Sequence, residues 1–285
     1  MSSFSKIITL LLSVLLLQVN SQAQSLLWKV SGKGLAQPSY LYGTHHMLCK
    51  GDLTFAPAVK EKLSKMSKVY FEIDMSDPSM IAKMQPLLLM PGGYSFKALF
   101  DSTDYKLLNN IIKTNYGMDL QFLDNAKPML VMSMLIPLMM PCKEQVSCEK
   151  ELTSLSKNLH KPIGGLETVE SQIAIFDSIP DKTEAKMIME MLKDSANTNK
   201  EFRAMSAAYK AQDLDKVYQS VMSSPDMKGF AGLLLFDRNA KWIPKIEAQM
   251  KKSPAFFAVG AGHLGGDKGV IALLRKKGYK VEPVK

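Results

Sequence analysis

The chain has 285 residues, a length that suits one domain with an insertion or two small domains. With 46% hydrophobic and 22% charged residues it is expected to be globular, and it has no collagen-like or disordered composition. Its 36 basic and 27 acidic residues give a net charge of +9, but nearly all the basic residues are lysines, with no arginine-rich or aromatic-interleaved stripe. We therefore expect no nucleic-acid partner.

The N-terminal segment has the pattern of a signal peptide. Lys6 precedes an apolar run over residues 7–17, and the small residues Ser21 and Ala23 occupy the positions before a cleavage site. The run is shorter than the roughly 20 residues that span a bilayer, and no later segment reaches that length. We predict that residues 1–23 are removed and that the protein is exported, to the periplasm or the medium, without a membrane span. An uncleaved membrane anchor is the alternative.

The cysteines form neither a CxxC pair nor a disulfide scaffold. In an oxidising compartment Cys142 and Cys148, with five residues between them, could form a bridge. Cys49 would then be left unpaired. A metal site would have to use histidine and carboxylate side chains.

Strand and helix patterns alternate at both ends of the mature chain, residues 24–285, which we expect to be a single domain. The stretch from about 77 to 252 is mainly helical, and we expect it to cap the site and shape its specificity. In chain order, the predicted elements are a strand at Ser39–Tyr42 ended by Gly43, a helix at Pro57–Ser67, a strand at Val69–Ile73, a short strand at Lys161–Leu166, a strand at Ala255–Val259 ended by Gly260, a helix at Gly269–Lys277 capped by Gly278, and a strand at Tyr279–Val284.

The two ends look like repeats of one unit, a strand followed by Gly-x-x-His, a helix and a second strand. The motifs are Gly43 to His46 and Gly260 to His263. Strand–helix–strand units require right-handed crossovers and a largely parallel sheet. The predicted fold is therefore α/β, with a central, mainly parallel sheet built from the two units and a large helical insertion.

Both histidine motifs fall at carboxyl ends of strands, where open parallel sheets place their ligand sites. His46 and His263 can therefore approach each other, and with Glu72 they would form a set of two imidazoles and a carboxylate that leaves metal positions open for water and substrate. Asp74 is the rival carboxylate, and a lysine salt bridge is the structural alternative for Glu72. We expect His45 to point away from His46.

Two further residues are candidates for the same site. Glu167 follows the short central strand and could bind the metal or take a proton from water. The alternative is that this segment only begins a helix capped by Thr168. Arg238 could clamp a carboxylate or an oxyanion, or it could instead pair with Asp237 or stack on Trp242.

Taken in order, these motifs resemble the TraB/GumN family, which is related to the Tiki proteases. The resemblance implies an α/β fold with duplicated halves and, in the Tiki branch, a metal-dependent peptidase that favours manganese or cobalt; zinc is also possible. It marks His46, His263 and Glu72 as the site. The segments that carry it are Leu26–Val30, Tyr40–His46, Phe71–Asp74, Leu166–Gln172, Arg238–Asn239 and Val259–Gly266.

One difference from the animal relatives limits which of their properties can be inferred for this chain. This chain has a predicted cleavable leader and no later span, unlike the membrane-bound animal relatives, so the resemblance does not supply the substrate. Our leading hypothesis is an exported metal-dependent hydrolase, peptidase-like, that acts on a peptide or protein. The alternative is a non-catalytic protein that sequesters a peptide, haem or metal ion in the same cleft. In a third interpretation the motifs have only a structural role and stabilise the ends of two strands.

Overall fold

The computed structural model describes residues 25–227 and 229–284. The predicted signal peptide lies outside these residues. A six-stranded sheet forms the centre of the molecule, with all its strands parallel except β1, which is antiparallel to both of its neighbours. The predicted α/β fold with a mainly parallel sheet is confirmed. From edge to edge, the strands are β6 (Ile163–Gly165), β4 (Lys68–Phe71), β7 (Ala255–Gly260), β2 (Ser39–Thr44), β1 (Leu27–Ser31) and β8 (Lys280–Pro283).

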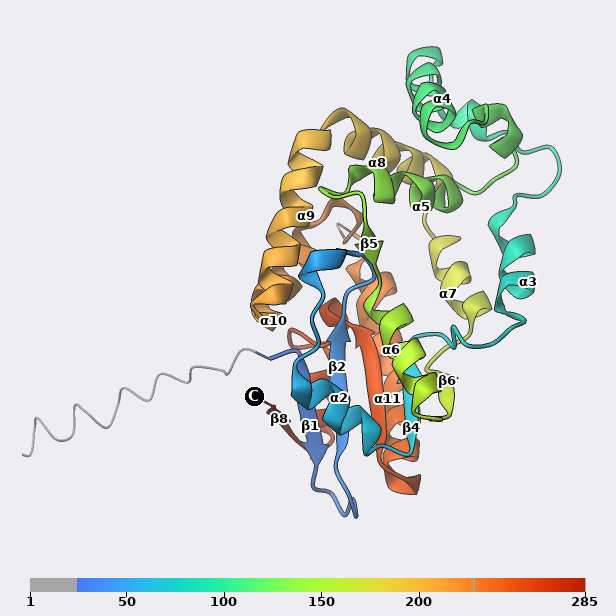
Figure 1. The fold of residues 1–285 in the computed structure, drawn as a ribbon. Coiled ribbons are helices and arrows are strands. Elements are labelled where there is room, and N and C mark those ends of the chain that lie inside the picture. Colours follow the sequence, from blue (N-terminus) through green and yellow to red (C-terminus); the bar gives the residue numbers. More distant parts are fainter. Residues whose placement is uncertain (1–24, 228, 285) are drawn as a thin grey trace, which may run out of the picture.

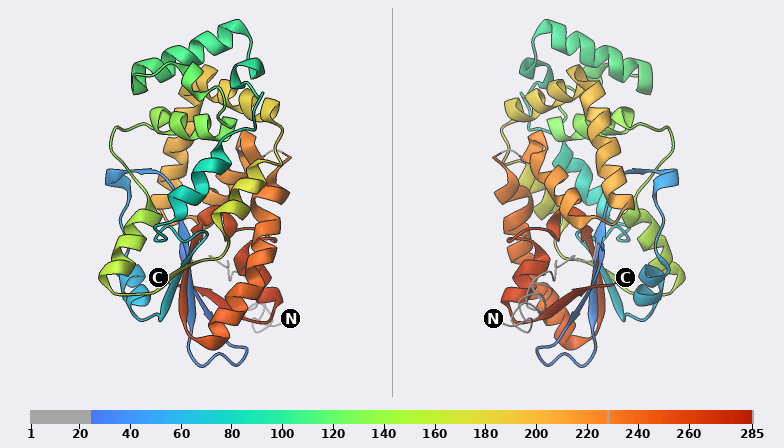
Figure 2. Two further views of the ribbon diagram at one scale, coloured as in Figure 1. Left: turned by 90° about the vertical axis from the view of Figure 1, so that its right-hand side faces the viewer. Right: turned by 90° about the vertical axis from the view of Figure 1, so that its left-hand side faces the viewer.

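Helices cover both faces of this sheet (Figures 1 and 2). Helices α2 and α6 lie against one face, and α11 and α12 lie against the other. The helices of the described residues are α2 (Pro57–Ser64), α3 (Met80–Met84), α4 (Ser102–Tyr116), α5 (Pro128–Met139), α6 (Cys148–Asn158), α7 (Val169–Phe176), α8 (Asp181–Lys193), α9 (Ser195–Lys210), α10 (Leu214–Ser223), α11 (Asp237–Lys252) and α12 (Val270–Lys276).

The apolar run of β7 explains its place in the middle of the sheet. Its residues Ala255 to Val259 are at most 1% exposed. Strands covered on both faces have continuous apolar sequences rather than alternating ones. The left-handed Gly278, with a φ of 90°, follows α12 and lets the chain turn into β8, as predicted.

The two Gly-x-x-His segments leave adjacent strands. Strands β2 and β7 are parallel neighbours, with Thr44 opposite Gly260. The next strands differ in place, because β4 pairs with β7 whereas β8 pairs with β1 at the far edge. A two-stranded sheet of β3 (Leu48–Cys49) and β5 (Gln145–Val146) also follows only the first motif. That the two units are repeats stays a prediction.

Part of the mainly helical middle of the chain, including α4, α5 and α8, gathers beyond one end of the sheet (Figure 1). There α4, α5 and α8 surround a second hydrophobic cluster, which includes Phe96, Leu108, Ile112, Leu135 and Ile188, each fully buried. The remaining turns of the described residues are η1 (Lys50–Asp52), η2 (Gln85–Leu88), η3 (Phe96–Leu99), η4 (Leu120–Leu123), η5 (Pro225–Met227), the π-helical η6 (Gly232–Phe236) and η7 (Ala261–His263).

The disulfide is not the one suggested by proximity in sequence. Cys49 is bonded to Cys142, and Cys148 is a buried free thiol. The expected Cys142–Cys148 bridge is therefore wrong. The physical reason is the pairing of β3 with β5, which brings Cys49 to the segment after Cys142, while Cys148 starts α6 and lies 3.2 Å from the hydroxyl of Tyr209. Across residues 25–227 and 229–284 no helix has the length and apolar character needed to cross a bilayer.

Candidate metal centre

Three adjacent strands end beside the candidate site. His46 lies two residues beyond β2, Glu72 follows β4 directly, and His263 lies three residues beyond β7. Strand β7 pairs with both β2 and β4 in parallel, so all three side chains leave the same end of the sheet. The topology thus brings together residues 217 positions apart in the chain.

The three side chains converge on Gly260. A methyl group placed on its α-carbon would lie 3.2 Å from Glu72 Oε1, 3.5 Å from His263 Cδ2 and 3.7 Å from His46 Nε2. The missing side chain of Gly260 therefore leaves a small space bordered by two imidazoles and a carboxylate. The backbone N–H of Gly260 also donates to Glu72 Oε1 at 2.8 Å.

Arg238 lies at the centre of the buried side of this cluster. Its guanidinium donates to Glu72 Oε2 at 2.6 Å and contacts Glu167 through both Nη2 and Nε. Its Nη1 donates to the carbonyl of Leu234 at 3.0 Å and lies 3.1 Å from His263 Nε2. All the N–H directions of the guanidinium are thereby used. Arg238 also stacks on Trp242, 4.9 Å from the ring centre, as the structural alternative predicted.

Local structure explains how Arg238 reaches the cluster. It is the second residue of α11, directly after the π-helical turn η6. Such turns are rare and often occur at functional sites. The turn places the carbonyl of Leu234 within reach of the same guanidinium that binds the carboxylates.

His263 is neutral and is oriented from behind by Asn239. Its Nδ1 lies 2.7 Å from Asn239 Oδ1, an acceptor, so Nδ1 carries the proton and Nε2 presents its lone pair to Arg238 Nη1. Both residues are buried, and burial lowers the pKa of His263 to about 3. A neutral imidazole held through its outer nitrogen is the usual form of a metal-binding histidine.

Glu72 is ionised in spite of its burial. Burial by itself would raise its pKa, but the neighbouring His263, Arg238 and His46 and the N–H of Gly260 lower the pKa of Glu72 well below its usual range. We attribute most of this lowering to Arg238, because its charge is permanent whereas His263 stays neutral.

His46 occupies the open side of the cluster. Its side chain is 71% exposed, and its Nδ1 lies 2.8 Å from Glu149 Oε1. Desolvation would lower its pKa, but the charge of Glu149 and the hydrogen bond to it outweigh this and raise the pKa of His46 to about 9. His45 turns toward Tyr209, with ring centres 5.6 Å apart.

The other predicted carboxylates have different surroundings. Asp74 Oδ1 accepts from the backbone and hydroxyl of Ser76, at 2.9 and 2.5 Å, within its own turn. Glu167 joins the cluster through Arg238, and Trp242 and Gln172 also donate to it. Thr168 and Ser171 form the capping box that begins α7, as the structural alternative predicted.

The glycine-rich segment after β7 serves close packing. A methyl group at Gly266, whose φ is 72°, would come within 2.5 Å of Tyr218 on α10, and one at Gly262 would lie 3.1 Å from Val221. These glycines let α10 lie directly on the loop that carries His263.

Two residues of the cluster were missed as functional candidates. Gln172 donates to Glu72 at 3.2 Å and to Glu167 at 3.0 Å. Glu149 contacts His46 from α6, 103 positions away in sequence. Gln172 is part of the segment that carries the family resemblance, but no local pattern distinguishes Glu149 from any other acidic residue in the first turn of a helix.

The donor set matches the chemistry of a divalent-metal site, although the donors are not gathered around a common point of coordination. Among residues 25–227 and 229–284, no three His, Cys, Asp or Glu side chains are placed to hold an ion as they stand. His263 Nε2 is 3.7 Å from Glu72 Oε1, and Arg238 supplies the positive charge between the acidic groups. Neutral His263, ionised Glu72 and the space at Gly260 nevertheless fit a divalent cation, which would displace the proton that Glu149 favours on His46.

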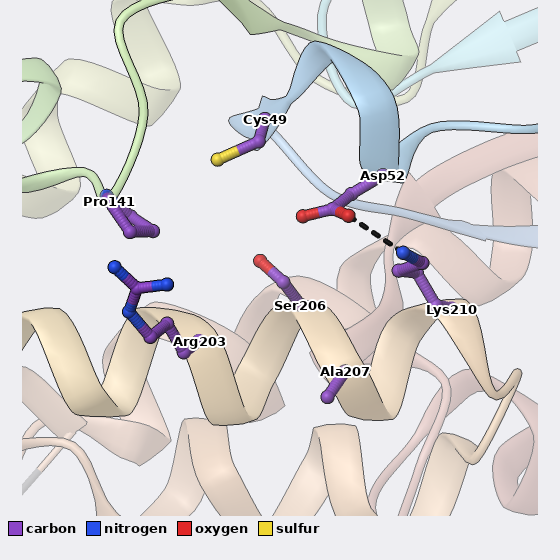
Figure 3. Close-up of a pocket in the computed structure, with 7 residues that line it drawn as sticks. All are labelled: Cys49, Asp52, Pro141, Arg203, Ser206, Ala207 and Lys210. Carbon is purple, nitrogen blue, oxygen red and sulfur yellow. Dashed lines mark hydrogen bonds and ion pairs between the residues drawn. The ribbon is translucent and has the colours of Figure 1, made fainter.

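A separate surface pocket of about 290 Å³ lies between α9 and the disulfide (Figure 3). It shares no residue with the cluster at Gly260. Of its charged residues, Arg203 and Lys210 are exposed and Asp52 is half-buried, whereas Glu72, Arg238 and His263 are at most 8% exposed. We place the candidate centre at the buried cluster because perturbed ionisable groups gather there. The pocket is lined by Cys49, Asp52, Pro141, Arg203, Ser206, Ala207 and Lys210.

Similarity to known proteins extends over most of this chain. The model of the TraB/PrgY/gumN family matches residues 26–283. The chain is 23% identical to the metalloprotease TIKI2 of Danio rerio over 90% of this chain and 60% of that protein. It is 24% identical to the metalloprotease TIKI1 of Danio rerio and of Homo sapiens, over 92% of this chain and 63% and 62% of those proteins. The chain thus spans about three-fifths of their length. No solved structure matches.

Proposed function

Because this chain belongs to the TraB/PrgY/gumN family, we propose that it is a metal-dependent hydrolase with peptidase-like activity, in which His46, His263 and Glu72 bind the metal. The observation that supports this most directly is the convergence of the three side chains on the space left by Gly260. Relatives named metalloproteases, at 23–24% identity, support the reaction class.

The proposed ligands are Nε2 of both histidines and the carboxylate of Glu72. Manganese or cobalt is the favoured ion and zinc is possible, since imidazole and carboxylate suit all three. A divalent ion bound there would activate water and polarise a carbonyl. Asn239 holds His263 in the tautomer that a ligand needs.

Arg238 is proposed to bind the substrate oxygen that gains negative charge. The lone pair of His263 Nε2 can serve either Arg238 or a metal ion, but not both. Metal binding would therefore leave one N–H of Arg238 without its present partner, at the centre of the site. A guanidinium N–H placed there can donate to the developing oxyanion, which is where hydrogen-bond donors accelerate hydrolysis most.

Glu167 is proposed to act through Arg238. Donors from Arg238, Trp242 and Gln172 already occupy its oxygens, so we assign it to holding the guanidinium in place. Oxygens that already accept from these donors are not free to accept from an attacking water. This assignment replaces a role as general base with a positioning role.

We further propose a peptide or protein substrate and a site of action outside the cytoplasm. The substrate follows from the named activity of the relatives. Export is supported by the N-terminal signal pattern and by the Cys49–Cys142 disulfide, since disulfides persist in oxidising compartments.

The test is elemental analysis of the purified protein, followed by cleavage of a peptide library with and without manganese, cobalt or zinc. We expect cleavage only with metal and none with His46→Ala or His263→Ala. His160→Asn is the matched control, because His160 is exposed and lies just before β6, whereas the cluster lies beyond the other end of the parallel strands. Circular dichroism would show that the variants remain folded.

Two outcomes would reject the proposal. Undiminished cleavage by either histidine variant would remove the metal site. Metal or peptide binding without turnover would favour the sequestering function, and a visible absorption band would identify haem.

A further inference from the structure

We propose that Glu149 is a positioning residue that holds the imidazole of His46 with Nε2 directed at the candidate metal centre. This inference rests on the proposed function, because it assumes that His46 binds metal. Glu149 does not touch the ion in this proposal. It acts through the other nitrogen of the ring.

Three donors surround the Glu149 carboxylate. Oε1 lies 2.8 Å from His46 Nδ1 and accepts from the Thr44 hydroxyl at 2.6 Å. Oε2 accepts from the Ser147 hydroxyl at 2.7 Å. Two of these partners flank the site from different elements, since Thr44 ends β2 and Ser147 is the N-cap of α6. The hydrogen bonds from Thr44 and Ser147 therefore fix the orientation of the carboxylate independently of His46.

The burial of Glu149 allows its contact with His46 to order the imidazole. Glu149 is 7% exposed, whereas the side chain of His46 is 71% exposed. An exposed imidazole without a partner changes rotamer freely, and ordering it for metal binding would cost conformational entropy. A rigid acceptor at Nδ1 removes that cost and leaves Nε2, 3.7 Å from the methyl position of Gly260, facing Glu72 and His263.

The arrangement matches the one behind the second ligand. Asn239 holds Nδ1 of His263, and Glu149 holds Nδ1 of His46. Both histidines thus have their outer nitrogen bound, with His46 Nε2 beside the space at Gly260 and His263 Nε2 3.7 Å from Glu72 Oε1. Carboxylate partners of this kind orient metal-binding histidines and increase their basicity.

The test is the affinity of the purified full chain for manganese ion alone, measured by isothermal titration calorimetry on wild type, Glu149→Ala, Glu149→Gln and Thr44→Val. We expect Glu149→Ala to weaken binding by about 10–100-fold. Glu149→Gln keeps an acceptor at Nδ1 without the charge, so its loss should be smaller. Thr44→Val should cause a still smaller loss of affinity, because it removes only one of the hydrogen-bond donors to the carboxylate.

Glu184→Gln is the matched control. Glu184 is also a buried glutamate in the first turn of a helix, 5% exposed, but it belongs to α8, away from the centre. Its replacement should leave manganese affinity within twofold of wild type, whatever it does to the melting temperature. A merely structural role for Glu149 would likewise move the melting temperature and not the affinity.

The outcomes separate the two proposals. If wild type binds manganese and Glu149→Ala binds it equally well, the positioning role is wrong and the metal site stands. If wild type binds no manganese, cobalt or zinc, both proposals are wrong. Should Glu149→Ala fail to fold, unchanged affinity in Glu149→Gln and Thr44→Val together would overturn the role.

Discussion

The guanidinium of Arg238 and the imidazole of His263 are joined at 3.1 Å, Nη1 to Nε2, inside a cluster that also contains two carboxylates. Arg238 is 8% exposed, and Glu72 is 6% exposed. Buried charges of this kind are tolerated only when they are paired, and Arg238 supplies the paired positive charge for Glu72 and Glu167.

Replacing Arg238 should therefore destabilise the protein strongly. We expect Arg238→Gln to lower the free energy of unfolding by about 3–5 kcal/mol, because Glu72 and Glu167 would lose the buried cation that contacts both of them. Urea denaturation measures this. Manganese should stabilise the variant more than it stabilises wild type, since the ion supplies the missing charge.

Arg203→Gln is the control for this prediction. Arg203 is exposed on α9 and bonds only Asn199 among the contacts of the described residues, so its loss should stay within about 0.5 kcal/mol. Equal destabilisation by the two variants would mean that pairing with Arg238 contributes no more to stability than an exposed contact does.

Gly260→Ala should separate folding from metal binding. Gly260 has a φ of −48°, which alanine adopts readily, so we expect stability within about 1 kcal/mol of wild type. The new methyl group would lie 3.2 Å from Glu72 Oε1, in the space between the proposed ligands, and should abolish manganese binding measured by calorimetry. Gly51→Ala, where nothing lies within 4 Å, is the control. Wild-type affinity in Gly260→Ala would place the metal elsewhere.

Glu184 should make stability depend on pH. Burial, followed by the charges of Asp181 and Asp177, raises its pKa from 4.5 to about 7. The folded state then binds more protons than the unfolded state between these values, so stability falls as pH rises from about 4.5 to 7. At 1.36 kcal/mol per pH unit the loss is at most about 3 kcal/mol.

Glu184→Gln should remove this component of the pH dependence and stabilise the protein at pH 8 more than at pH 5. Thermal unfolding at both pH values measures the difference. Glu190→Gln, an exposed change on the same helix, should leave the slope as it is. A slope that Glu184→Gln does not alter would contradict the assignment.

The disulfide closes a separation of 93 residues, so breaking it should cost substantial stability. We expect Cys142→Ser to lower the free energy of unfolding by about 3–5 kcal/mol. Non-reducing peptide mapping should link Cys49 to Cys142. Cys148 should react with thiol reagents only after unfolding, since burial raises its pKa to about 11. A Cys142–Cys148 peptide would disprove the connectivity.

Much of the fold was predictable from local sequence. The apolar runs of β7 and β4, the helical spacing of α2 and the glycine after α12 each determine an element through near neighbours. The predicted ends were off by only a few residues; α2, for example, ends at Ser64 rather than Ser67. The Thr168 cap was also visible, because capping depends on residues three positions apart.

The partners of the predicted site residues were not predictable in the same way. Arg238 was a candidate clamp, but the sequence could not show that it contacts Glu72, Glu167 and His263 at once. Glu149 offered no signal, because its role depends on α6 packing beside the end of β2. The disulfide pairing was predicted wrongly for the same reason, since proximity in sequence favoured Cys142–Cys148 over Cys49–Cys142.

Sequence patterns alone predicted a mainly parallel α/β sheet and indicated two histidines and a glutamate at the same end of it. The packed fold showed in addition that these side chains converge on Gly260, that Arg238 pairs with Glu72 and Glu167, and that Glu149 contacts His46. The physical reason is the separation along the chain over which each interaction acts. Strand and helix formation depends on residues a few positions apart, whereas ion pairs and hydrogen bonds join whichever side chains the packed elements bring together.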